Sequence, residues 1–345
     1  MSFSRNKRDA IKHYILEQID KECADVVKKT VDAFEITSTS VYRYIKEMEK
    51  EGILSKKGHT YSLIEERDIF TYETKIVSDE MDIMERDIDP LLDQCASNVQ
   101  RIWRYCLSEM INNVLDHSNA DKFAIIYTKN YMSISFFIVD NGVGIFRKIK
   151  DYYNMSSLDD AISELFKGKL TTDKANHSGE GIFFSSNAMD RFAAFSDGKI
   201  FTRNKYEEVN IDSLQLNLNR ENGSISGMNK GTIVYLKLSN FSTKSIAKIM
   251  DRFSSVDNGF YKTNIPIKNI FDDYPVSRSQ AKRLVRRFES FKEVVLDFEG
   301  VDDAGQGFMH ELFVVYGKSH PGVKLVPVNA NKNVKRMINH VMNTT

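Results

Sequence analysis

Residues 109–117 read Glu109-Met-Ile-Asn-Asn113-Val-Leu-Asp-His117. An acid, an amide and a histidine stand here at intervals of four residues. Because residues four apart lie nearly above one another on a helix, Glu109, Asn113 and His117 are predicted to form one polar stripe. Apolar side chains fill the other side of this segment: Ile102, Trp103, Leu107, Met110, Ile111, Val114 and Leu115. The pattern predicts a helix that buries one side and presents polar groups on the other.

A second informative stretch is Asp140-Asn-Gly-Val-Gly144, which follows an apolar run at residues 133–139. The run is typical of a buried strand, so the Asp140 carboxylate is expected where that strand ends. Gly142 and Gly144 would let the backbone turn close to a ligand. Two later motifs also precede regular elements: Gly179-Glu-Gly181 before a helix expected at 182–191, and Gly231-Thr232 before a strand expected at 233–238.

These motifs, in this order on a helix, a strand and a second helix, resemble the nucleotide-binding fold of the GHKL superfamily. That superfamily includes gyrase, histidine kinases and the anti-sigma-factor kinases. The resemblance covers roughly residues 78–240, and several ordered motifs make it more specific than one glycine motif. It implies a GHKL (Bergerat) α/β sandwich at residues 78–245 that binds ATP and Mg²⁺.

The resemblance also implies a role for each motif residue. Asp140 would accept a hydrogen bond from the adenine amino group, Gly142 and Gly144 would let the chain pass under the base, and Thr232 would reach adenine through water. Asn113 would offer a carbonyl oxygen to Mg²⁺, which prefers oxygen ligands and would offset the phosphate charge.

The remaining motif residues would act near the phosphates. Glu109 would orient or deprotonate the attacking water. Gly179 and Gly181 would place N–H groups near the phosphates at a helix start. His117 is interpreted as a packed neighbour of the site or, less favoured, as a direct ligand. Residues 145–178 stand where the superfamily has its ATP lid, and five lysines there are candidates for phosphate contact: Lys148, Lys150, Lys167, Lys169 and Lys174.

Residues 1–66 are expected to form three helices and a hairpin. Thr37-Ser-Thr-Ser40 would cap a third helix at 41–51, and a turn at 56–59 would join two short strands. This part resembles a bacterial winged helix-turn-helix, whose third helix enters the DNA major groove. The resemblance implies DNA contacts by Ser38, Thr39, Ser40, Tyr42, Arg43 and Lys46, and phosphate contacts by Lys56, Lys57 and His59. A protein-docking role stays open, because residues 1–60 carry twelve Lys/Arg against ten Asp/Glu, a charge of only +2.

A connector is expected at residues 67–77, and alternating strand and helix patterns predict a small α/β unit at 262–345. An edge strand is expected at 263–267, because Pro266 lacks an N–H. Further elements are expected at 278–290 (helix), 294–298 (strand), 304–316 (helix), 323–328 (strand) and 331–341 (helix). The stripe Arg278, Lys282, Arg286 and Arg287 is interpreted as a solvated face rather than a nucleic-acid patch.

The segments Ser277-Arg-Ser-Gln-Ala-Lys-Arg283, Leu296-Asp-Phe298 and Gly305-Gln-Gly-Phe308, with Glu311, resemble a STAS-like domain of unknown function that follows GHKL modules in some bacterial proteins. STAS anti-anti-sigma factors carry a phosphorylatable hydroxyl in an Asp-Ser-Ser-Gly-type turn. Here the comparable turn reads Asp302-Asp-Ala304-Gly305. This difference weakens the idea that the chain phosphorylates its own tail at that turn.

The bulk properties agree with an α/β (α+β) protein of two or three domains, since the chain has 345 residues and no net charge. Its three cysteines lack the close pairing of metal-binding motifs and are expected to be reduced thiols. We find neither a signal peptide nor an apolar run of membrane-spanning length, and expect a cytoplasmic protein that does not enter a membrane.

The leading functional hypothesis is an ATP-dependent DNA-binding switch. Mg-ATP binding and slow hydrolysis would reorient or dimerise the winged helix and the tail, which requires two states of different ATP affinity. Candidate partners are therefore DNA, a second copy of the chain and a protein that binds the tail. The alternative is a serine/threonine protein kinase of the anti-sigma-factor type that acts on a partner protein. A histidine kinase of the usual layout is disfavoured because residues 78–105 contain no histidine. A nucleotide-binding module without turnover is a third hypothesis.

Overall fold

The chain has a mixed α/β fold, seen in a computed structural model that describes residues 4–170, 179–204, 231–271 and 274–343. It divides into two compact units. The first comprises Met1–Ile69, Ile126–Phe136 and Lys237–Ser242, and the second comprises Phe70–Ile125, Phe137–Leu236 and Thr243–Thr345. Within the described residues, no helix is both long and apolar enough to cross a membrane.

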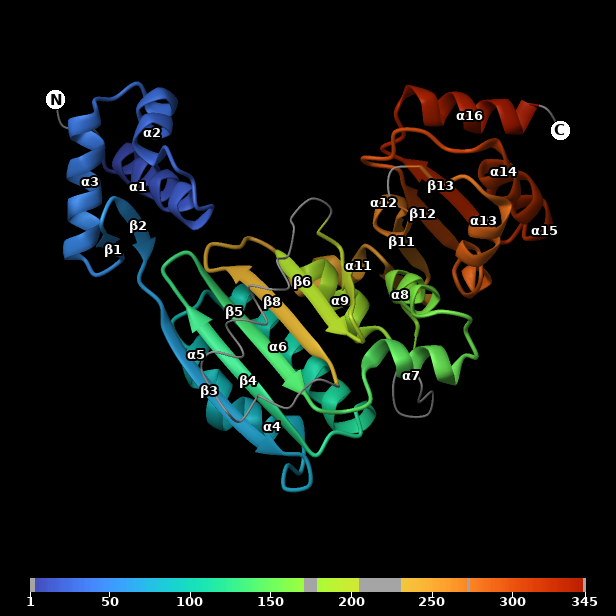
Figure 1. Cartoon of the computed structure of the whole chain (residues 1–345), viewed down its shortest axis with the longest axis horizontal. Helices are drawn as coiled ribbons and strands as arrows, with labels where there is room; N and C mark the ends of the chain where they lie inside the picture. Colours follow the sequence, from blue (N-terminus) through green and yellow to red (C-terminus); the bar gives the residue numbers. More distant parts are fainter. Residues whose placement is uncertain (1–3, 171–178, 205–230, 272–273, 344–345) are drawn as a thin grey trace. The chain divides into compact units, whose positions relative to one another are not determined.

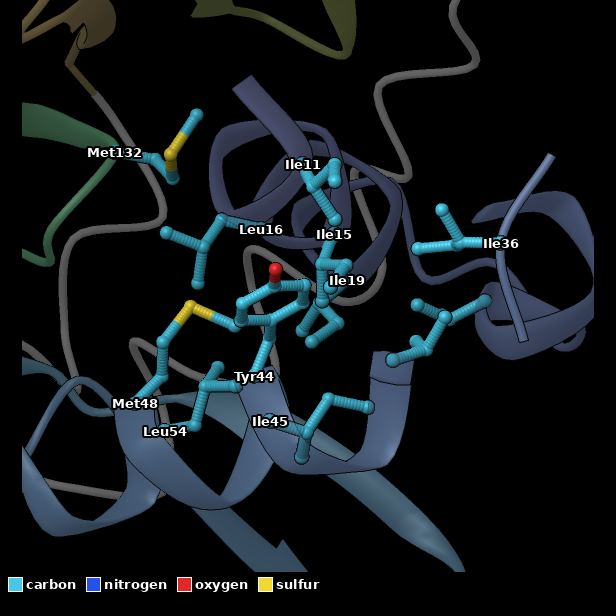
Figure 2. Close-up of a cluster of buried hydrophobic side chains, with 12 residues drawn as sticks. Ile11, Ile15, Leu16, Ile19, Ile36, Tyr44, Ile45, Met48, Leu54 and Met132 are labelled. Carbon is cyan, nitrogen blue, oxygen red and sulfur yellow. The ribbon is translucent and has the colours of Figure 1, made fainter. Parts of the chain in front are cut away.

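The first unit contains the expected three helices and hairpin. These are α1 (Arg5–Asp20), α2 (Val26–Phe34), α3 (Ser38–Lys50), β1 (Leu54–Lys57) and β2 (Thr60–Leu63). The Thr37 hydroxyl accepts a hydrogen bond from the Ser40 N–H, so α3 begins three residues earlier than expected. Figure 2 shows the core, where Tyr44 and Met48 of α3 meet Ile15 of α1, with Met132 beside them.

A six-stranded sheet has the order β3-β4-β5-β8-β6-β7. Its strands are β3 (Glu66–Glu73), β4 (Lys122–Lys129), β5 (Ser133–Asp140), β6 (Arg191–Ser196), β7 (Lys199–Thr202) and β8 (Ile233–Ser239). Strand β3 lies where we expected a connector at 67–77. The sequence pattern missed it because β3 is an edge strand with one buried side chain, Tyr72, which stacks on Phe123.

Helices of the second unit accompany this sheet, with α4, α5 and α6 behind its strands in Figure 1. They are α4 (Glu80–Ile83), η1 (Met84–Ile88), α5 (Asp89–Leu92), α6 (Ser97–Asn112), η2 (Asn113–His117), α7 (Ile145–Tyr152), α8 (Leu158–Lys167), α9 (Gly181–Ala188) and α11 (Ile246–Asp251). As predicted, α6 buries Ile102, Trp103, Leu107, Met110 and Ile111.

The C-terminal part of the second unit contains a parallel three-stranded sheet in the order β11-β12-β13. Its strands are β11 (Lys262–Pro266), β12 (Glu293–Asp297) and β13 (Lys324–Val328), preceded by the short pair β9 (Ser254–Ser255) and β10 (Gly259–Phe260). Its helices are α12 (Ile267–Phe271), α13 (Arg278–Leu284), η3 (Phe288–Ser290), α14 (Gln306–Met309), η4 (His310–Tyr316), α15 (Gly317–Ser319) and α16 (Lys332–Asn343).

Two expectations for this part have clear outcomes. Strand β11 lies at the sheet edge, which confirms the edge position predicted from Pro266. The helix expected at 278–290 is shorter: Ser277 caps it with a capping box, but it ends at Leu284. Arg287 then adopts a left-handed backbone conformation with φ of 62°, which an α-helix cannot accommodate.

Candidate functional site

A cavity of about 240 Å³ lies in the second unit. It is bounded by α6 and η2, the end of β5, α7, the segment after α8, α9, β6 and β8. Eight of the residues selected from the sequence line it: Glu109, Asn113, His117, Asp140, Gly144, Gly179, Gly181 and Thr232. The folded chain therefore brings together motifs that are far apart in sequence.

The polar stripe spans a change of helix type. Glu109 lies in α6, whereas Asn113 and His117 lie in η2, a π-helical turn. π-Helical turns are rare and often occur at functional sites. All three side chains still line the cavity, while Leu115, expected among the buried residues, is only half-buried.

Asp140 is held rigidly at the end of β5. Its Oδ1 accepts hydrogen bonds from the N–H groups of Gly142 (2.8 Å) and Thr232 (3.3 Å), and its own N–H donates to the Thr232 carbonyl (3.0 Å). The Thr232 hydroxyl accepts from the Ile145 N–H (3.1 Å). Burial raises the pKa of the Asp140 carboxyl, and the two N–H donors oppose that rise. The carboxylate is thus a fixed acceptor in the cavity wall.

Glycine is required where Glu109 meets α9. A Cβ on Gly181 would lie 2.1 Å from Glu109 Oε2, so the carboxylate packs directly on this backbone. Burial makes the largest contribution to the raised pKa of Tyr105, and the charge of the neighbouring Glu109 makes the next largest. The Tyr105 hydroxyl therefore stays protonated beside Glu109, and the start of α9 and Tyr105 together fix the position of the acid.

The other glycines have distinct roles. Gly144 lines the cavity with φ of 87°, and a Cβ there would lie 2.5 Å from Ser196 Oγ. Gly142 is not among the lining residues. It packs on the Ser118 carbonyl, and its N–H fixes Asp140. Gly142 therefore supports the cavity wall from behind, whereas the sequence resemblance implied a position under a ligand.

The structure distinguishes among the five candidate lysines. Lys148 lines the cavity, and its Nζ donates to the His117 carbonyl. Lys150 pairs with Asp151 at 3.0 Å. Lys167 is fully buried against Glu164, and Lys169 Nζ donates to the Ser290 carbonyl at 2.9 Å. Lys174 lies outside the described residues. Lys148 is thus the described candidate that reaches the cavity.

The apolar part of the lining was missed by sequence reasoning. It consists of Met110, Val114, Val143, Ile145, Ile149, Leu165, Leu170, Ile182, Phe183, Phe192, Ala194 and Val234. The alternation of Phe192 and Ala194 along β6 is a signal that could have placed them on one face of a strand. Leu165 and Leu170 carry no comparable signal, because their position depends on how the segment after α8 packs.

The donor set is suited to a ligand with an apolar group and negative charge. Apolar side chains supply much of the cavity wall, and Lys148, Asn113 and the start of α9 offer hydrogen-bond donors. Among the described residues, no three His, Cys, Asp or Glu side chains form a metal-binding group. Mg²⁺ commonly takes one or two oxygens from a protein and the rest from its ligand and water, and Asn113, which lines the cavity, carries an amide oxygen.

The residues selected for DNA contact lie on α3 and the hairpin of the first unit. Ser38, Thr39, Tyr42, Arg43, Lys46, Lys56, Lys57 and His59 are exposed, and Ser40 is half-buried. Arg43 lies 3.9 Å from Glu47, an exposed pair that offsets part of the positive charge. The Ser40 hydroxyl contacts Thr37, so Ser40 belongs to the first helical turn.

The comparison with known families concerns the C-terminal part. Residues 280–335, from within α13 to within α16, match the family model of a STAS-like domain of unknown function (DUF4325). The chain carries a C-terminal STAS-like domain. No curated protein matches the chain. In this STAS-like domain Ala304 is buried, and its N–H bonds the Asp303 carboxylate, so the turn at 302–305 offers no hydroxyl at that position.

Proposed function

We propose that the cavity binds ATP together with Mg²⁺ in the manner of the GHKL superfamily, and that the protein is an ATP-hydrolysing, DNA-binding regulator. One observation carries the proposal: Asp140 and Thr232, 92 residues apart, are hydrogen-bonded to each other on the wall of the cavity that Glu109 and Asn113 also line. The cavity is slightly below the roughly 300–1,000 Å³ typical for drug-sized ligands, which suits a nucleoside-sized group.

Different residues of the cavity would bind different parts of the nucleotide. Asp140 would accept the adenine amino hydrogen, because its carboxylate is fixed and cannot rotate away. Val143, Ile145 and Val234 would contact the faces of the base. Exclusion of water by these walls strengthens the polar contact. Adenine would thus be selected by one polar contact within an apolar wall.

Other residues of the cavity wall would bind the phosphates and Mg²⁺. Asn113 would contribute its amide oxygen to Mg²⁺, and Lys148 would contact phosphate directly. Magnesium, when bound, would neutralise developing phosphate charge. Glu109, held between Tyr105 and Gly181, would take a proton from the attacking water. Its position beside the first residue of α9 places the base next to N–H groups suited to anions.

The DNA-binding part of the proposal rests on the first unit's resemblance to winged helix-turn-helix domains. The side chains of α3 that would enter the major groove point outward, including Tyr42, which is 48 % exposed. Lys56 and Lys57 on the hairpin would then contact phosphates.

The deciding experiment measures Mg²⁺-dependent ATP binding by calorimetry and turnover by phosphate release, for wild type and Glu109→Ala. Asp116→Asn is the matched control, because Asp116 is an exposed acid on η2 that does not line the cavity. Binding by all three proteins, with turnover by wild type and Asp116→Asn but not by Glu109→Ala, would support the ATPase. If ATP labelled on its terminal phosphate transfers the label to a protein and not to free phosphate, the serine/threonine kinase alternative is favoured. No binding by wild type would refute the nucleotide site.

DNA binding is tested separately, by selecting sequences from a random duplex pool and measuring their affinity with and without Mg-ATP. A change of affinity or oligomeric state with nucleotide would support the switch. Equal DNA affinity and the same oligomeric state in both conditions would refute coupling, and failure to enrich any duplex would favour a protein-docking role for the first unit.

A further inference from the structure

A short segment at the end of α8 forms part of the cavity wall. This pocket loop comprises residues 166–170, the last two residues of α8 and the three that follow, and its Gly168 and Leu170 line the cavity. Its carbonyl groups are held from outside the cavity. The Thr263 hydroxyl of β11 donates to the Lys167 carbonyl at 2.7 Å, and Arg287 Nη2 donates to the Lys169 carbonyl. The wall of the cavity therefore depends on residues of the C-terminal part.

Arg287 makes the most extensive of these contacts. While Nη2 bonds the pocket loop, Nη1 donates to Glu164 Oε2 of α8 at 2.8 Å. The other Glu164 oxygen accepts from Lys167 Nζ, which also donates to the Arg286 carbonyl at 2.7 Å. Glu164 and Lys167 are buried. Because the guanidinium is planar and its donors have fixed directions, this one side chain holds α8 and the pocket loop in a fixed relative position.

Ring packing holds the same loop from another side. Gly168 has φ of 80°, and a Cβ there would lie 2.7 Å from the Phe260 ring. Lys169 Nζ donates to the Ser290 carbonyl and lies 4.9 Å from the centre of the Phe291 ring. The pocket loop thus has little freedom to move while these contacts persist.

The backbone conformation of Arg287 is unusual and directs its side chain toward these contacts. Its φ of 62° is unfavourable for a residue with a side chain, and such conformations persist only where surrounding contacts enforce them. The sequence alone favours continuation of the helix through this position, yet α13 ends at Leu284. The early end of the helix turns the Arg287 side chain toward Glu164 and the pocket loop.

We infer that Arg287 of the STAS-like domain is a positioning residue for the nucleotide cavity, acting through the pocket loop. This inference rests on the proposed ATP site and deepens it. The STAS-like domain supports the cavity wall from outside, so its contacts with the pocket loop and ATP occupancy would influence each other. Such coupling is reciprocal: what strengthens ATP binding must equally strengthen docking of Arg287.

The test compares wild type with Arg287→Ala, Arg287→Lys and the control Lys282→Ala. Lys282 is an exposed cation of α13 that takes no part in the pocket-loop contacts described above, so its loss tests charge alone. Removal of Arg287 should weaken Mg-ATP binding about 5- to 150-fold, with a smaller effect on kcat than on KM. The Mg-ATP affinity of Arg287→Lys should lie between those of wild type and Arg287→Ala, because an ammonium group cannot bridge both acceptors. Lys282→Ala should bind as wild type does.

A second measurement separates positioning from loss of the fold. In wild type, Mg-ATP should slow hydrogen exchange of the amides at 286–291, and in Arg287→Ala it should not do so at saturating nucleotide. If Arg287→Ala changes neither the nucleotide affinity nor the effect of nucleotide on hydrogen exchange, the inference is refuted while the ATP site remains intact. Wild type that binds no nucleotide would refute the proposed function and this coupling together. A variant that loses its cooperative melting transition is replaced by Thr263→Val, for which the same two results are expected.

Discussion

Substitution of Asp140 by Asn should weaken ATP binding and leave the fold intact. The amide keeps a carbonyl oxygen where Oδ1 accepts from the N–H groups of Gly142 and Thr232. The side chain also keeps its shape within the wall. What changes is the charge, and the second oxygen becomes an NH₂ group that would face the adenine amino group, donor against donor.

The expected loss of affinity follows from the contact removed. A hydrogen bond to a charged group contributes about 1.5–3 kcal/mol, which corresponds to about a 10- to 150-fold weaker Kd. Stability should change in the opposite direction. Burial raises the folded-state pKa of Asp140 above 3.8, so the folded state binds the proton more tightly than the unfolded chain. The free energy of unfolding of the ATP-free protein therefore falls as pH rises from near 3.8 through that raised pKa.

Asparagine does not titrate, so Asp140→Asn should lack this loss and be at least as stable as wild type at neutral pH. Calorimetric titration with Mg-ATP measures the affinity, and melting curves across pH measure the stability. Nucleotide should raise the Tm of wild type by mass action and leave that of the variant almost unchanged. An unaltered Kd would refute the adenine contact. A variant much less stable than wild type at neutral pH would refute the account of the buried charge.

Three further changes test other parts of the site. Gly181→Ala should reduce phosphate release about 10²-fold or more with a smaller change in ATP affinity, because its Cβ would displace the Glu109 carboxylate; equal turnover would contradict the role of Glu109. Lys148→Ala should weaken ATP more than adenosine in competition titrations, whereas Lys150→Ala should not, and equal effects on both ligands would exclude a phosphate contact. Lys46→Ala should lower the slope of log K against log salt for DNA by about 0.9; an unchanged slope would remove it from the interface.

Much of the cavity could be predicted because it is encoded in local patterns. The spacing of Glu109 and Asn113 specifies a helix face, and the apolar run before Asp140 specifies a strand end. Thr37 and Ser277 each cap a helix, and capping depends on residues three positions apart. Such features need no knowledge of the rest of the chain.

Other features depend on contacts that no local pattern reveals. The stripe Arg278, Lys282, Arg286 and Arg287 was interpreted as a solvated face, and three of its members are exposed. Arg287 is the exception, since it is half-buried and pairs with Glu164, 123 residues earlier. Likewise, Lys148 could not be separated from the other lysines of its segment, because all of them have the same local composition.

The STAS-like domain offers the clearest argument about how the parts work together. A substrate for phosphotransfer at the turn of residues 302–305 would need a hydroxyl, and Ala304 is a buried methyl group. The same domain supplies Arg287, whose guanidinium holds the pocket loop and α8. A regulator built in this way would transmit nucleotide occupancy through packing and charge, with no need for a phosphorylated intermediate on its own C-terminal turn.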